Sequence, residues 1–196
     1  MKKNVIFSNL FFFLSINISL FSFLACEKIE ETNGILVENQ PLEKSTLPAC
    51  LQSFPNILVN TTSDITDFVG NQQVVDLPGP DGLISLHEAM IAAENTPGSQ
   101  YIGFNIPVND IGFNGKVFTI VPTVPLPELC NNGTTVDGGT QALFTGNTNP
   151  FGPEIVLDGS LAGETGGISV RSDSNTFRNL VIHSFEFAGI QFNEDP

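Results

Sequence analysis

The sequence predicts an all-β fold in which short parallel strands stack as a β-helix, a solenoid whose N-terminal end is covered by a short α-helix. Three observations predict it: a composition rich in turn-forming residues, motifs that recur about every 22 residues, and one strongly capped helical segment. The 196-residue chain contains 18 Gly and 13 Pro, which favours short strands joined by many turns. Its length suits one domain plus an export segment.

Two motifs recur at nearly constant spacing and predict the stacked strands. Gly-Ile-Ser-Val at 167–170 returns 22 residues later as Gly-Ile-Gln-Phe at 189–192. Val-Asp-Gly at 136–138 returns 21 residues later as Leu-Asp-Gly at 157–159. About 22 residues hold three short strands and three turns, so residues 101–196 predict about four rungs. Apolar side chains of the first pair are expected to face the interior: Ile168, Val170, Ile190 and Phe192.

Residues 85–98 predict the helix and its ends. Ser85 and Glu88 have the Ser-x-x-Glu spacing of a capping box, in which each side chain satisfies a backbone amide of the other residue. Asn95 suits the helix end, and Pro97 prevents continuation. The resulting helix of about nine residues is too short to be stable alone, so it must dock on an apolar surface.

The segment around this helix resembles the Asp-Gly-x-Cys-Ser-Leu-Arg-Glu-Ala-Ile pattern that opens many bacterial extracellular β-helix proteins, called the CSLREA domain. The positions that match it are Asp81, Gly82, Ser85, Leu86, Glu88 and Ala89. The chain departs from it at Ile84, where the pattern has Cys, and at His87, where it has Arg. The resemblance covers about residues 74–192 and includes the strand-like Tyr-Ile-Gly-Phe-Asn at 101–105. It implies a right-handed parallel β-helix like that of pectate lyases, with the helix over its N-terminal end.

Residues 1–25 predict a lipoprotein signal peptide. Lys2 and Lys3 precede an apolar stretch that ends in Phe-Leu-Ala-Cys at 23–26, which is similar to a lipobox with Phe where Leu is usual. Cys26 would then be the lipid-carrying N-terminus of a bacterial envelope protein, at the outer membrane or cell surface. An uncleaved membrane-spanning helix and an ordinary cleaved signal are the two alternatives.

The mature chain divides into three predicted parts. Residues 26–49 are polar and acidic without clear periodicity, and they predict a flexible tether. Residues 50–100 predict a cap that contains the helix and short strands at 56–60 and 73–77. Residues 101–196 predict the rungs, which stop without a polar cap, so the coil is either truncated or covered by a partner or by itself.

Cys50 and Cys130 remain once Cys26 is assigned to the lipid. Outside the cytoplasm a disulfide between them is permitted, and two separate buried thiols are the alternative. The chain has no Cys-x-x-Cys motif or Cys/His cluster, so a zinc site is not expected.

The charge balance restricts the partners. Without the predicted signal, 5 basic residues stand against 21 acidic ones, a net charge of −16. Nucleic-acid binding needs a basic surface, so DNA and RNA are not expected partners. The expected partners are a membrane through the lipid anchor, a glycan or protein ligand, and a second copy paired end to end through the open C-terminal rung.

No catalytic residue is assigned from the sequence. Asp137 and Asp158 recur at matching positions, as the acid pair of a glycoside hydrolase would, but each precedes Gly in a strand-end turn. His183 lacks a paired acid or nucleophile in the sequence, and His87 is expected on the helix surface. Arg178 is interpreted as an ordinary outward residue.

No cofactor is expected. Asp158, Glu164 and Asp173 could contribute to a calcium site, but no calcium-loop spacing is present. A β-eliminating lyase needs a strong base, and the two candidates Arg171 and Arg178, seven residues apart, are expected on different faces.

The leading hypothesis is a non-enzymatic, lipid-anchored surface or periplasmic protein whose β-helix binds or displays a glycan or protein. One alternative is the N-terminal part of a β-helix polysaccharide lyase or hydrolase. Another is a degenerate fragment without independent function. The β-helix fold hosts enzymes and adhesins alike, so fold alone does not decide between them.

Overall fold

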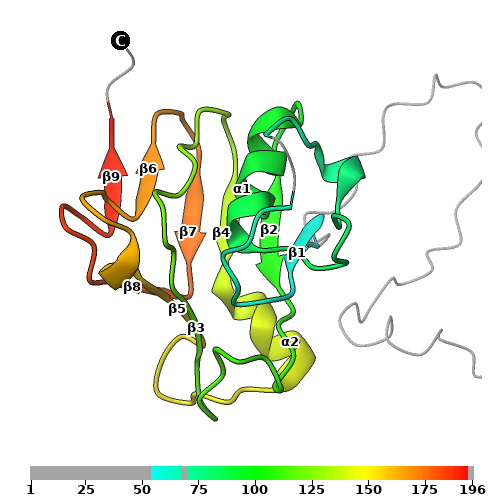
Figure 1. Ribbon diagram of the computed structural model, residues 1–196, viewed down its shortest axis with the longest axis vertical. Coiled ribbons are helices and arrows are strands. Elements are labelled where there is room, and N and C mark those ends of the chain that lie inside the picture. The colour runs from blue at the N-terminus through cyan, green and yellow to red at the C-terminus, as the bar shows by residue number, and fades with distance from the viewer. Residues whose placement is uncertain (1–53, 68–69, 194–196) are drawn as a thin grey trace, which may run out of the picture. The chain divides into compact units, whose positions relative to one another are not determined.

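Figure 1 shows the computed structural model, which describes residues 54–67 and 70–193. The predicted signal and tether, with Cys26, and Cys50 lie outside the described residues. The strands are β1 (Ile57–Val59), β2 (Tyr101–Phe104), β3 (Phe118–Ile120), β4 (Thr135–Asp137), β5 (Ile155–Asp158), β6 (Ile168–Val170), β7 (Thr176–Arg178), β8 (Leu180–His183) and β9 (Ile190–Phe192). The helices are η1 (Val74–Asp76), α1 (Leu86–Asn95), η2 (Gly138–Thr140), α2 (Gln141–Thr145) and η3 (Gly159–Leu161), where η marks a 3-10 helix.

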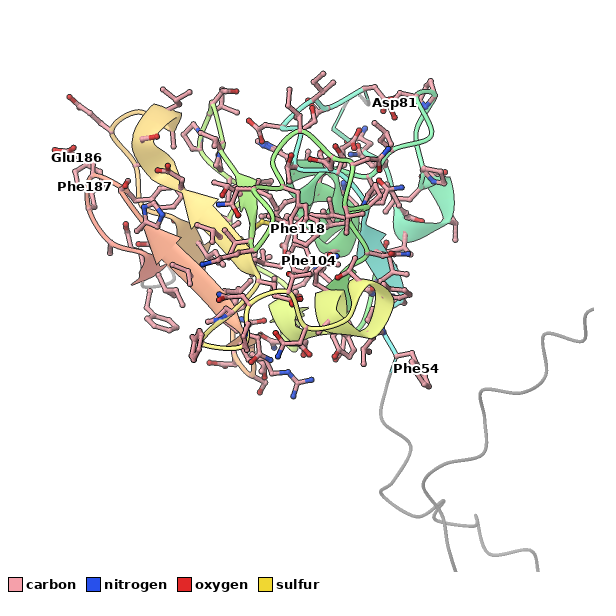
Figure 2. The ribbon with its side chains drawn as sticks, turned by 90° about the horizontal axis from the view of Figure 1, so that it is seen from below. Phe54, Asp81, Phe104, Phe118, Glu186 and Phe187 are labelled. Carbon is pink, nitrogen blue, oxygen red and sulfur yellow. The ribbon has the colours of Figure 1, made fainter. Side chains whose placement is uncertain are left out.

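The strands form three parallel sheets, in the orders β1-β2-β4-β7, β3-β5-β8 and β6-β9. Apolar residues lie in register from strand to strand, so that Ile102 pairs with Ile57 on one side and with Val136 on the other. The inward side chains of all three sheets belong to one apolar core. Figure 2 shows two of its largest members, Phe104 and Phe118, in the interior, and both are fully buried.

Helix α1 is part of this core, and Ser85 caps it. The Ser85 hydroxyl accepts a hydrogen bond from the Glu88 amide (3.2 Å), and Glu88 Oε2 accepts one from the Ser85 amide (2.9 Å). The capping box therefore lies at the two residues from which the sequence predicts it. The helix packs against β1, β2 and η1 (Figure 1), and its inward side chains are at most 1% exposed: Leu86, Ala89, Met90 and Ala93.

The predicted fold class is wrong. The described residues combine parallel sheets with short helices in a mixed α/β-like arrangement, and neither an all-β fold nor a solenoid of about four rungs is found in them. Helix α1 is built into the core, and α2 follows η2 where the sequence predicted only strands and turns. Among the described helices, none has the length and apolar character needed to cross a membrane.

Residues 73–77 illustrate one cause of this error, because they form η1 and not the predicted strand. The Val74 amide donates to the Thr96 hydroxyl (2.9 Å), and the Gln73 amide donates to the Asp76 carboxylate (2.8 Å). These contacts draw the chain into a turn although two adjacent valines favour an extended backbone. One tertiary contact, to Thr96, and one local bond, to Asp76, have overridden the extended preference of the valines here.

The constant repeat period is a second error. Paired strands are offset by 22 residues between β6 and β9, where Ile168 pairs with Ile190 as expected. Between β4 and β7, inside the predicted repeat, the offset is 41 residues, since Thr135 pairs with Thr176. The intervening segment contains η2, α2 and η3, so inserted helices and loops lengthen the interval.

The last strand of each sheet, β7, β8 or β9, is less buried than the strands before it. Phe192, predicted to face the interior, is 77% exposed, whereas Ile168 and Val170 are buried as predicted. Ile190 is only partly buried against the core. Within the described residues, β7, β8 and β9 each pair with a neighbour on one side only.

Candidate binding cleft

Asp137 organises the corner where β4 meets the turn between β7 and β8. Its Oδ2 accepts hydrogen bonds from the Tyr101 hydroxyl and the Arg178 guanidinium, both at 2.8 Å. Its Oδ1 accepts bonds from the Gly139 amide and the Asn179 side-chain amide, both at 2.9 Å. The side chain is only 7% exposed, and each oxygen already holds two donors. Asp137 therefore links β2, β4 and β7 through a satisfied buried network.

The same contacts set the acidity of Asp137. Burial is the largest single influence and raises its pKa, yet hydrogen bonds from Asn179, Tyr101, the Gly139 amide and Arg178 together hold that pKa below the ordinary value. The pKa of Arg178 is raised, first by its bond to Tyr101 and then by Asp137. A carboxylate that is ionised and bonded on both oxygens is poorly placed to exchange protons with a substrate.

Two interpretations made from the sequence are corrected at this corner. Arg178 is not an ordinary outward residue, because it pairs with Asp137 and donates to the Tyr101 hydroxyl at 3.0 Å. Asp137 and Asp158 do not occupy matching positions of one stack, because β4 and β5 belong to different sheets. Each of the two acids nevertheless begins a 3-10 helix and accepts the backbone amide two residues further on, the turn role expected for it.

Asp158 meets His183 across the β5–β8 pair, so this histidine does have an acid beside it. His183 Nδ1 lies 3.7 Å from Asp158 Oδ1 and 2.7 Å from Ser184 Oγ. In a nucleophilic triad, the acid and the serine contact opposite nitrogens of the imidazole, whereas here both face Nδ1. The three residue types are present, but their geometry is not that of a catalytic relay.

His87 is less exposed than predicted. Its side chain is 13% exposed, and its Nδ1 lies 3.5 Å from Asp64 Oδ1. Asp64 also accepts bonds from the Thr123 backbone amide (2.7 Å) and hydroxyl (2.9 Å). Burial raises the pKa of Asp64, but these bonds from His87 and Thr123 hold it below its ordinary value. Asp64 thus connects α1 to the loop after β3, at the edge of a cleft of about 400 Å³.

Metal and disulfide expectations have separate outcomes. Within residues 54–67 and 70–193, no three Asp, Glu, His or Cys side chains are placed to hold a metal ion, so Asp158, Glu164 and Asp173 do not form such a group.

The Cys130 amide donates to Glu94 Oε2 at 2.8 Å. Its predicted disulfide partner lies outside the described residues, so that pairing stays a prediction.

A second cleft, which we call the Glu154 cleft, adjoins the Asp137 network. It encloses about 320 Å³, and its lining includes Gly138, Gly139, Asn147, Gly152, Glu154 and Asn179. Gly138 is required because a Cβ there would collide with the backbone carbonyl of Asn179. Asn179 has a left-handed φ of 55°, which asparagine tolerates better than most residues, and Asp137 holds its side chain. One wall of the cleft is therefore fixed in place.

Glu154 is the buried acid of this cleft, with 5% of its surface exposed. Its Oε1 accepts bonds from the backbone amide and hydroxyl of Thr148 and from the Asn149 amide. Its Oε2 is also buried, and no donor of the described residues lies within hydrogen-bonding distance of it. Buried polar atoms are normally bonded, so this oxygen is a spare acceptor. Sequence reasoning missed Glu154 because its partners lie in a loop without a recognisable motif.

Exposed aromatic residues neighbour the lining residues in the chain. Ala142 also lines the cleft, and Phe144 lies two positions after it in the sequence. Phe151 directly precedes the lining residue Gly152. Phe144 is 50% exposed and Phe151 is 99% exposed. Exposed apolar side chains close to a polar hollow are typical of ligand-binding surfaces.

No protein-family model, curated protein or solved structure matches this chain. The resemblance of residues 74–192 to the CSLREA domain therefore stays a prediction from the residues quoted for it. The candidate site stands on its own geometry.

Proposed function

We propose that this chain is a non-enzymatic, lipid-anchored protein of the bacterial cell envelope that binds a glycan in the Glu154 cleft. The observation that carries the proposal is the cleft itself, with a spare buried acceptor and a wall held by Asp137. Sugar rings offer hydroxyl groups around their rim and apolar C–H faces. They therefore suit a polar hollow with exposed phenyl rings nearby.

Binding accounts for the acidic residues better than catalysis does. Glycoside hydrolysis uses two carboxylates, and Glu154 is the one carboxylate among the described residues that line the cleft. Asp137 has both oxygens occupied, and Asp158 shares one imidazole nitrogen with Ser184. Asp137 and Asp158 therefore stabilise the fold, and the Glu154 cleft is the place where we expect the ligand to bind.

The envelope location is supported by the sequence features at the N-terminus. The lipobox-like segment at 23–26 offers Cys26 for acylation, and the acidic segment 26–49 would place the described part at a distance from the membrane. A net charge of −16 on the mature chain disfavours acidic glycans, so we expect the ligand to be neutral.

One experiment tests binding and turnover together. The full chain, purified in detergent, is titrated with labelled neutral oligosaccharides, and the same mixtures are analysed for new reducing or unsaturated ends. Saturable binding without product supports the proposal. Product formation would overturn the non-enzymatic role in favour of a lyase or hydrolase. A chain that neither binds nor melts cooperatively would overturn it in favour of a degenerate fragment.

The anchor has its own test. Cells that produce the wild type or the Cys26→Ala variant are grown with radioactive palmitate, and the protein is immunoprecipitated. We expect label on the wild type alone, because the lipid is attached to the Cys26 thiol and to the new amino terminus that cleavage there exposes. Equal labelling of both proteins would reject the lipid anchor.

A further inference from the structure

We propose that Glu154 is the recognition residue of its cleft, with Oε2 accepting a hydrogen bond from a hydroxyl group of a neutral saccharide. This inference rests on the proposed function and names the ligand class and the recognising atom of the same site. It starts from the unequal bonding of the two carboxylate oxygens. Oε1 is held by Thr148 and Asn149, whereas Oε2 has no donor among the described residues.

The environment of Oε2 makes a ligand bond there strong. Glu154 lines the cleft, but Oε2 is itself buried, so a ligand donor reaches it only when the carboxylate turns toward the opening. A hydrogen bond to a charged group is worth more in a poorly hydrated place than in water. The last torsion of a glutamate side chain is soft, so a small turn can bring Oε2 toward a donor. Because the carboxylate is rigid, Oε1 moves with it, and the bonds from Thr148 and Asn149 adjust to the new position.

The neighbouring polar groups indicate a ligand that donates at more than one point. One of the two hydrogens on the Asn179 side-chain amide nitrogen is engaged by Asp137, so Asn179 can offer a ligand its side-chain oxygen and the second hydrogen. Together with Glu154 Oε2, the cleft therefore presents two acceptors and one donor. A polyhydroxyl compound satisfies several acceptors at once, as a saccharide does.

Neutral saccharides fit better than charged ones. A uronic acid would bring its carboxylate close to Glu154 and to a strongly acidic chain, at a cost in electrostatic repulsion. An ammonium group could donate to Oε2, but the exposed phenyl rings would add to its binding only if it lay over the face of a ring. Phe151 directly precedes the lining residue Gly152 and is exposed, so its ring is a candidate surface for the apolar face of a neutral sugar.

The decisive variant is Glu154→Gln, which replaces one carboxylate oxygen with an amide nitrogen of the same size. The Gln oxygen can keep the bonds to Thr148 and Asn149, while the nitrogen presents a donor where the ligand needs an acceptor. With a labelled neutral hexasaccharide from the binding screen as probe, we expect Kd to rise at least tenfold, about 1.4 kcal/mol. We expect the variant to melt cooperatively but at a lower temperature, because the bonds from Thr148 and Asn149 lose their charged acceptor.

Glu94→Gln is the matched control. Glu94 also accepts bonds from consecutive backbone amides, those of Cys130 and Asn131, but it does not line the cleft. The same chemical change there should leave the affinity for the hexasaccharide within about twofold of the wild type. An equal loss of affinity in both variants would overturn the assignment of Glu154.

A steric pair of variants separates this inference from the proposed function. A Cβ at Gly152 would meet only Asn149 Nδ2, at an ordinary 3.6 Å, so Gly152→Ala should fold normally and serves as the folding control for a larger side chain at this position. Gly152→Phe should fill the cleft and abolish binding. If Gly152→Phe abolishes binding and Glu154→Gln does not, the cleft binds the glycan but Oε2 is not its acceptor, and the inference is wrong.

Two further outcomes complete the test. If the hexasaccharide binds equally to Gly152→Phe and to the wild type, the glycan binds elsewhere, and the cleft fails as the site of the proposed function. A chitosan hexamer that binds more tightly than the neutral hexasaccharide, with an affinity that falls in high salt and is lost in Glu154→Gln but not in Glu94→Gln, would show that Oε2 recognises an ammonium group. That result would overturn the hydroxyl assignment alone.

Discussion

Two regions of the molecule are built from the same parallel pairing but differ in how well they are buried. The closed region consists of β1, β2 and β4 with α1 packed against β1 and β2, and the open region consists of β7, β8 and β9 (Figure 1). In the closed region, Ile57, Ile102 and Val136 stack in register and are at most 2% exposed. In the open region, Phe177 and Ile190 are only partly buried.

The difference teaches that strand pairing alone does not bury a parallel sheet. β1 lies at a sheet edge with one neighbour, yet Ile57 and Val59 are at most 2% exposed, because α1 packs against this strand. Within the described residues, β7, β8 and β9 also lie at sheet edges, but α1 does not cover them, and their apolar side chains are only partly buried. Local stability should therefore decline from the closed region to the open region.

The largest expected effect is in the closed core. Phe104→Ala removes a fully buried ring and should lower the free energy of unfolding by about 3–5 kcal/mol. Phe177→Ala in the open region removes a ring that is only partly buried, and we expect less than half that loss. Urea unfolding of both variants measures the comparison. Equal losses would show that the open region is as well packed as the closed one.

The second effect concerns Asp137, which connects the two regions through Arg178 and Asn179. Asp137→Asn should cost about 2–3 kcal/mol at pH 7, because several bonds to a charged, buried group are weakened. The folded-state pKa lies below the ordinary value of about 3.9, so this stabilisation is present above that pH. It should be lost as the pH falls through the folded-state pKa.

Unfolding of wild type and Asp137→Asn is therefore measured at neutral pH and in steps below pH 4. We expect the difference between the two proteins to shrink toward zero on the acid side. Amide exchange of β7 in Asp137→Asn should also increase before that of β2. A difference that grows as the pH falls would contradict a lowered pKa for Asp137 in the folded protein.

The third effect is at the start of α1. Ser85→Ala removes the hydroxyl that caps the Glu88 amide and should cost about 1 kcal/mol. Ser184→Ala in the open region removes an exposed hydroxyl that lies beside His183 and Asp158, and it should change stability by less than about 0.5 kcal/mol. Thermal melts of the two variants provide the measurement. A larger loss from Ser184→Ala would remove the distinction between the regions.

The range of an interaction along the chain explains which features the sequence predicts. Ser85 and Glu88 are three residues apart, so their spacing alone encodes the capping box, and the repeat at 167–170 and 189–192 predicts the β6–β9 pair. The Asp-Gly turns at Asp137 and Asp158 are equally local and were also predicted. Their sheets were not, because a turn motif does not specify which distant strand pairs with the one before it.

The residues of the candidate site were largely missed, because their contacts follow no spacing rule that the sequence displays. Arg178 donates a hydrogen bond to Tyr101, which lies 77 residues earlier in the sequence, and neither residue belongs to a motif that predicts this contact. Glu154 has one buried oxygen without a hydrogen-bond partner among the described residues, as Asp64 and Asp67 also do, and no sequence motif marks these three acids. Such features follow from the packing of loops between strands, which periodicity and capping rules do not describe.

The smallest expected effect is at Arg171. Comparing it with Arg178 shows which partner's burial controls the free energy that an ion pair contributes to folding. Arg171 lies 3.2 Å from Glu128, with exposed side-chain fractions of 34% and 27%, whereas Arg178 is 54% exposed but pairs with an Asp137 that is 7% exposed. If burial of the acid controls the energy, Arg178→Gln should cost more than Arg171→Gln, even though Arg178 is the more exposed arginine. We expect less than about 1 kcal/mol for Arg171→Gln, falling toward zero in about 1 M salt. Urea unfolding at low and high salt ranks the two variants, and the reverse order would mean that exposure of the arginine matters more.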